Sequence, residues 1–146
     1  MATTRLVRFV LDTNVLVAAL RSPLGASHAL VSRLPLPGWE LVLSVPVYLE
    51  YQDVLLRPGL VPSELSRADI LAFCRFLASV AHAQDVHFLW PSFLPDPKDD
   101  MLLELAVASG ATHIVAHNIR HFREMASFGV CALAPAAFLR SIDLQI

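Results

Sequence analysis

The sequence predicts an α/β fold, a three-layer α/β/α sandwich in which helices cover both faces of a central, mostly parallel sheet. Short apolar runs alternate along the chain with segments of helical spacing, a pattern typical of parallel strands joined by helices. The apolar fraction of 55% exceeds the average of about 45–50%, as expected of a sheet buried on both faces. The length of 146 residues is usual for one domain, so we take residues 1–146 as a single domain.

Turn and cap residues set the boundaries of the predicted elements. Prolines and glycines at residues 22–25, 35–38 and 58–59 separate the first helices. Ser63 and Asp99 are placed to cap two helices, and Gly110 is placed to end the second of them. The predicted strands cover residues 6–11, 40–44, 86–90, 112–115 and 130–133. The predicted helices cover residues 15–20, 26–34, 46–56, 62–80, 99–109 and 119–127, and a last helix begins at residue 135.

Polar side chains lie where predicted strands end or where the following helices begin. Asp12 closes the first strand, Glu50 lies early in the helix after the second strand, and Asn118 lies just past the fourth. Three more acids lie between the third strand and its helix: Asp96, Asp99 and Asp100. Because the carboxyl ends of parallel strands meet at the ligand-binding edge of such sheets, we expect these groups to converge there.

Carboxylates that converge repel one another unless a cation neutralises them. Oxygen ligands suit Mg²⁺ or Mn²⁺, which can polarise a phosphoryl oxygen and orient an attacking water. Each residue also has an ordinary interpretation: the aspartates could cap helices, Glu50 could be solvated, and Asn118 could be a turn residue. The joint pattern, rather than any single position, favours a metal site.

The overall composition sets the class of protein but not its ligand. The chain has 11 Lys and Arg residues against 13 Asp and Glu, a net charge of -2, so global charge gives no sign of nucleic-acid binding. Cys74 and Cys131 lie far apart among apolar residues and are expected to be free thiols in a reducing compartment. No apolar stretch approaches the ~20 residues of a membrane span. We therefore expect a cytoplasmic protein without a membrane partner. Apolar residues beyond the needs of the core, at 34, 36, 39 and 65–80, are expected to form a partner surface.

The sequence resembles the PIN domains, particularly the toxin-like branch related to VapC ribonucleases. The similarity starts with LDTNVLVAAL at residues 11–20 and continues through LSVPVYLEYQDVLLRP, DPKDDMLLELAVASGATHIVAHNIRHF and the closing LAPAAFL. It covers nearly the whole chain in the right order. The resemblance implies the PIN fold, Mg²⁺ or Mn²⁺ as cofactor, hydrolysis of RNA phosphodiesters, a small antitoxin partner and a homodimer.

The resemblance also implies roles for individual residues. It places the first two family acids on Asp12 and Glu50, and the third on Asp99 or Asp100, of which Asp99 fits the spacing to Gly110 better. Thr13 and Asn14 match the polar positions that steady the first acid, and Asp96 is a further supporting residue. The fourth family position, often an acid, is Asn118 here. An amide can still ligate a metal ion or position a water, but it lowers the negative charge of the site.

The most basic stretch of the chain, residues 117–123, follows the fourth strand. Arg120 and Arg123 could hold substrate phosphates beside the acidic site, with His121 as a further contact; the alternative is a solvated helix face. The spacing of four between His113, His117 and His121 also raises a zinc site, but His113 is predicted on a strand, so the three should not share one helical face.

Three other functions are weighed against the ribonuclease. A non-catalytic PIN-like domain that binds RNA or a protein partner is favoured slightly by Asn118 and by the unremarkable net charge. An aspartyl phosphatase normally needs a second Asp two residues after the first, and Asn14 cannot exchange a proton. A dinucleotide-binding domain needs a glycine-rich turn after the first strand, which DTNVL lacks.

Overall fold

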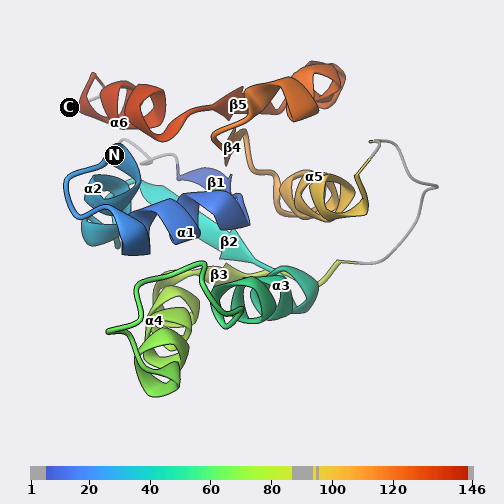
Figure 1. Ribbon diagram of the computed structural model, residues 1–146. Coiled ribbons are helices and arrows are strands. Elements are labelled where there is room, and N and C mark those ends of the chain that lie inside the picture. The colour runs from blue at the N-terminus through green and yellow to red at the C-terminus, as the bar shows by residue number, and fades with distance from the viewer. Residues whose placement is uncertain (1–5, 87–93, 95, 145–146) are drawn as a thin grey trace.

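The computed structural model describes residues 6–86, 94 and 96–144 (Figure 1). Its elements are, in chain order, β1 (Val7–Leu11), α1 (Thr13–Arg21), α2 (Ala26–Ser32), β2 (Trp39–Leu43), α3 (Val45–Leu55), α4 (Arg67–Val80), β3 (His82–Ala83), α5 (Pro97–Ser109), β4 (His113–Val115), the 3₁₀ helix η1 (Ile119–Phe128), β5 (Cys131–Leu133) and α6 (Pro135–Asp143).

The strands form one parallel sheet in the order β3-β2-β1-β4-β5. Phe9 on the central strand β1 is in register with Leu41 on β2 and with His113 on β4. Because all strands run in one direction, their carboxyl ends share one edge. Asp12 follows β1 at that edge, and its backbone N–H donates to the carbonyl of Val115 at the end of β4 (2.9 Å).

The helices cover both faces of this sheet. The chain moves outward from β1 to β3 through α1–α4 and then returns through α5 and η1 to the other half of the sheet. With right-handed crossovers, the two sets of connections lie on opposite faces. Accordingly, α5 packs on β1, β2 and β4 beside η1, whereas α1 packs with α2 and α3, and α6 lies against α2 (Figure 1). The predicted α/β/α sandwich with a parallel sheet is confirmed.

The core explains the high apolar content of the chain. Phe9, Val10 and Leu11 on β1 are fully buried, as expected of a strand with neighbours on both sides and helices on both faces. Phe138 of α6 packs its ring against Phe9 (centroids 5.0 Å apart) and edge-on against Trp39 (5.1 Å). Trp39 is therefore core, as are Leu34 and Leu36, all less than 9% exposed. The expectation that these three form a partner surface is wrong.

Two predicted helix starts are displaced. Ser66, not Ser63, caps α4: its hydroxyl accepts from the Asp69 N–H while the Asp69 carboxylate accepts from the Ser66 N–H, a complete capping box. Asp96, not Asp99, caps α5, and its side chain accepts from the Lys98 N–H (2.9 Å). The predicted end of α5 at Gly110 is confirmed, since that residue has φ +74°, which glycine adopts without strain.

The third strand and the last crossover also differ from the prediction. The predicted strand at 86–90 lies outside the described residues except for Val86, and β3 is instead the two-residue pairing of His82 and Ala83 with Val42 and Leu43. The predicted helix over 119–127 is a 3₁₀ helix, kinked at Phe122.

Two further expectations can be compared with the described residues. Both Cys74 and Cys131 are free thiols, Cys74 buried and Cys131 exposed. No single helix in the described part of the chain is long and apolar enough to cross a membrane. Only α1 and α2 taken together meet that test of length and composition, and they are bent by 98° at the break between them.

Candidate active site

Asp12 is held at the carboxyl end of the central strand. Its backbone is extended between β1 and α1, and the hydroxyl of fully buried Tyr51 on α3 donates to the carbonyl of Leu11, the preceding residue. Burial raises the pKa of the Asp12 carboxyl, and the backbone N–H groups of Thr13 and Asn14 only partly offset this rise. The fold thus places an aspartate where its negative charge is disfavoured.

Glu50 comes from α3, the helix that follows the neighbouring strand β2. Its side chain is only 18% exposed and forms an ion pair with the Nζ atom of Lys98 on α5 (3.1 Å). Glu50 and Tyr51 are adjacent in the sequence, so the residue that anchors Leu11 sits next to an acid of the site. Lys98 is the only lysine of the sequence, and this ion pair connects α3 to the first turn of α5.

Asp99 is the most perturbed acid of the site. It lies in the first turn of α5 and is 8% exposed. Burial, followed by the negative charges of Asp96, Asp12 and Asp100, raises the pKa of Asp99 to about 6, while the nearby His121 opposes the rise. The Oδ2 atom of Asp99 lies 3.4 Å from Nδ1 of His121.

Asn118 and His121 bring the loop after β4 and the start of η1 to the same place. The Nδ2 atom of Asn118 is 3.0 Å from Nε2 of His121. An amide nitrogen can only donate, so Nε2 accepts and the proton of a neutral His121 ring resides on Nδ1, facing Asp99. Asn118, His121 and Asp99 therefore form a polar chain along one wall of the site.

These residues line a single cavity of about 340 Å³ at the carboxyl edge of the sheet, which we call the acidic cavity. Its polar lining consists of Asp12, Thr13, Asn14, Glu50, Arg57, Asp96, Lys98, Asp99, Asn118 and His121. Four elements that are far apart in sequence therefore supply one polar site, in the place where parallel α/β sheets bind ligands.

Three of the predicted residues lie elsewhere. Asp100 does not line the acidic cavity: it is 3% exposed, and its Oδ1 atom accepts from the backbone N–H of Leu94 (2.7 Å). Arg120 and Arg123 line a different cavity, next to β5. Of the two neighbouring aspartates at the start of α5, it is thus Asp99 that faces the acidic site.

The structure adds three residues that the sequence analysis did not assign to the site: Tyr51, Arg57 and Lys98. A sequence signal existed for Arg57, because it is a cationic residue directly after the predicted helix that carries Glu50. Lys98 had a weaker signal, as a lone lysine between Asp96 and Asp99. Nothing in the sequence singled out the contact of Tyr51 with Leu11.

The oxygen donors of the acidic cavity suit a hard divalent cation. Asp12 and Asp99 have raised pKa values and repel each other, and a bound cation would relieve both effects. Within the described residues, however, no three His, Cys, Asp or Glu side chains are grouped closely enough to form a metal site as they stand. The three histidines considered for zinc are separated as well: His113 packs on Trp39 and Phe138, and His117 contacts Ser27.

These features define a class of protein: a parallel α/β/α sandwich with an acid-lined cavity at the carboxyl edge of its sheet. The chain belongs to the PIN domain family, whose model, described as PIN domain, matches residues 8–120. The resemblance noted in the sequence is thereby confirmed.

A solved structure agrees with this assignment. A chain in the crystal structure of VapBC2 from Rickettsia felis bound to a DNA fragment from their promoter has a similar fold, with a TM-score of 0.60 and 14% identity over 87% of this chain and 98% of that chain. This likeness supports the fold. No curated protein sequence matches the chain.

Proposed function

We propose that this protein is a metal-dependent endoribonuclease that hydrolyses RNA phosphodiesters, and that it is the VapC-like toxin of a toxin–antitoxin pair. The observation that carries the proposal is the convergence of Asp12, Glu50 and Asp99 on one cavity together with Asn118. The membership in the PIN domain family supports the same reaction.

Asp12, Glu50 and Asp99 would hold Mg²⁺ or Mn²⁺, with the carbonyl oxygen of Asn118 as a further, neutral donor. The ion would supply charge neutralisation at the phosphate and a polarised water. Neither Asp12 nor Asp99 can ligate a cation well while protonated. Because the pKa of Asp99 is about 6, ion binding should weaken as the pH falls through that value.

The remaining polar residues of the cavity would handle the substrate. Lys98 and Arg57 are the cationic side chains that line the acidic cavity, and they are partly exposed. Either can pair with a phosphate oxygen. His121, oriented by Asn118 and facing Asp99, is placed to hold or deliver a proton at Nδ1. Thr13 and Asn14 border Asp12 and keep its carboxylate in place.

The test is Mn²⁺-dependent cleavage of single-stranded RNA by the wild-type protein and by Asp12→Asn. Asp85→Asn, an exposed aspartate outside the acidic cavity, is the matched control. We expect Asp12→Asn to abolish cleavage while retaining the fold by circular dichroism, and Asp85→Asn to cleave like the wild type. Equal rates for Asp12→Asn and the wild type would refute the nuclease assignment.

A non-catalytic PIN-like domain that binds RNA or a protein is the alternative. Two observations favour it: Asn118 is uncharged, and Lys98 already pairs with Glu50 inside the cavity. Calorimetric titration with Mn²⁺ separates the two functions, because the alternative predicts no binding at millimolar metal. An antitoxin and a second copy of the chain remain proposed partners, which size-exclusion chromatography and co-purification with the neighbouring gene product would test.

A further inference from the structure

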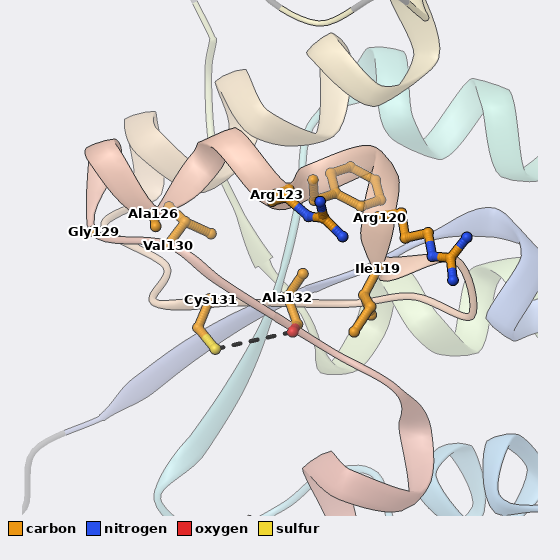
Figure 2. Close-up of a pocket in the computed structure, with 9 residues that line it drawn as sticks. Ile119, Arg120, Arg123, Ala126, Gly129, Val130, Cys131 and Ala132 are labelled. Carbon is orange, nitrogen blue, oxygen red and sulfur yellow. Dashed lines mark hydrogen bonds between the residues drawn. The ribbon is translucent and has the colours of Figure 1, made fainter.

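A second cavity, of about 550 Å³, lies between η1 and β5 (Figure 2). We call it the arginine cavity, because Arg120 and Arg123 line it together with Ile119, Ala126, Cys131 and Ala132. It shares no lining residue with the acidic cavity. The sequence analysis placed both arginines beside the acids, whereas the structure assigns them to this separate site.

The two arginines carry positive charge that is available to a ligand. Both side chains are exposed, and neither takes part in an ion pair among the side chains that the structure describes. Figure 2 shows both arginines on the η1 side of the cavity and Cys131 and Ala132 on the β5 side. An anion bound in the cavity would be attracted by both positive charges. Their planar forks match phosphate oxygens in particular.

The rest of the arginine cavity is apolar and shallow. Ile119 exposes 45% of its surface. The lining also includes the small residues Ala126, Gly129 and Ala132, whose side chains fill little of the cavity. Such a slot accepts a flat group, which the arginine side chains could cover by stacking. A ligand that combines phosphates with flat rings fits both halves of the cavity. A nucleic-acid strand carries both phosphates and flat rings along its length.

One segment connects the two cavities. Asn118 and His121 line the acidic cavity, and Ile119, Arg120 and Arg123 line the arginine cavity. An RNA strand with a phosphate at Asn118 can therefore reach the arginines by passing over this one segment.

We propose that the arginine cavity is an accessory subsite for the single-stranded RNA substrate, in which Arg120 and Arg123 bind phosphates and a base lies against Ile119 and Ala126. This inference rests on the proposed function, because it takes RNA as the substrate. In this proposal the arginines raise the affinity for the part of the RNA strand that lies outside the cleaved bond.

The first test measures RNA binding without metal, so that cleavage plays no part. The probe is a fluorescein-labelled 20-nucleotide single-stranded RNA of mixed sequence, read by anisotropy in EDTA at several salt concentrations. Arg120→Gln/Arg123→Gln is compared with Arg67→Gln/Arg75→Gln, which removes the same charge from exposed positions on α4. We expect the first variant to weaken binding about tenfold and to reduce the slope of log K against log salt by about 1.4, because two phosphate contacts are lost.

The second test uses Cys131 as a reporter inside the cavity. Cys131 is exposed and lines the arginine cavity, whereas Cys74 is fully buried. Saturating RNA should slow alkylation of Cys131 by N-ethylmaleimide several-fold in the wild type, but not in Arg120→Gln/Arg123→Gln at the same RNA concentration.

Three results would overturn the inference. The first is equal RNA affinity of the two double variants, and the second is no protection of Cys131 by saturating RNA. The third is that Arg120→Gln/Arg123→Gln loses binding to a poly-glutamate peptide while its RNA binding is unchanged. The last result would make the cavity a site for an acidic protein. Failure of the nuclease proposal is read separately, from Mn²⁺-dependent cleavage. A protein that binds RNA through the arginines and never cleaves it would refute the nuclease and leave the subsite standing.

Discussion

Replacing Asp99 by asparagine should stabilise the metal-free protein, because the wild-type carboxylate is buried among other acids. The pKa of about 6 exceeds the ordinary value of 3.8, and at about 1.4 kcal/mol for each pH unit this corresponds to at most about 3 kcal/mol at neutral pH. The Asp99→Asn substitution keeps the shape of the side chain and removes its charge. For a chain of this length, a gain of that size raises Tm by about 6–12 °C.

The sign of the effect follows from the protonation of the two states. With a raised pKa, the folded chain binds more protons than the unfolded chain between about pH 4 and pH 6, so wild-type stability falls as the pH rises through this window. Above it, the difference between Asp99→Asn and the wild type should be constant. Below about pH 4 both states of the wild type are protonated at Asp99, and the difference should vanish.

The assay is thermal unfolding in EDTA at pH 7 and at pH 3.5, with Asp85→Asn as the control. The control substitution lies on the surface and should change stability by less than about 0.5 kcal/mol. A repeat at pH 7 with Mn²⁺ should stabilise the wild type and leave Asp99→Asn nearly unchanged, because ligand binding stabilises only a competent folded state. If Asp99→Asn unfolds at a lower temperature than the wild type in EDTA at pH 7, the burial and repulsion assigned to Asp99 are refuted.

Two further substitutions test other parts of the site. Tyr51→Phe removes the hydroxyl that donates to the Leu11 carbonyl. It should lower the free energy of unfolding, measured in urea, by about 1–2 kcal/mol. The control is Tyr48→Phe, at a half-buried tyrosine on the same helix, and equal stability of the two variants would contradict the role of this hydrogen bond. Asn118→Asp adds a carboxylate to the acidic cavity, which should tighten Mn²⁺ binding by calorimetry. Unchanged Mn²⁺ affinity would remove residue 118 from the metal site.

The parallel sheet could be predicted because its local signals are strong. Phe9, Val10 and Leu11 form an apolar run that ends in an acid, and Gly110 ends α5 in the conformation that favours glycine. The sequence also carries a signal for the start of α4: Ser66 has an acid three residues later, as a capping box requires, whereas Ser63 has a serine there. The strand β3 has only two residues and is defined by its partner β2, so no periodicity could reveal it.

The site was predicted as a set of acids, and the details depended on side-chain directions. Successive residues of a helix point about 100° apart, so Asp99 and Asp100 could not both face the acidic cavity. The packing of α5 on the sheet decides which of the two aspartates faces the cavity. This packing depends on contacts between residues that are far apart in the sequence. Arg120 and Arg123 come soon after Asn118 in the sequence but line a separate cavity. Residues 119–128 form a kinked 3₁₀ helix, whose faces differ from those of an α-helix.

Because of the hydrogen bond from Tyr51 to Leu11, the two halves of the acidic cavity are held in place by different contacts. Asp12 follows Leu11 and Glu50 precedes Tyr51, so this one contact between buried neighbours fixes the relative position of the two acids. The positions of Asp99 and Asn118 depend instead on how α5 and η1 rest on the sheet. Substitutions under α5 should therefore move Asp99 while the Asp12–Glu50 pair stays in place, which makes α5 the element through which the geometry of the site can be tuned.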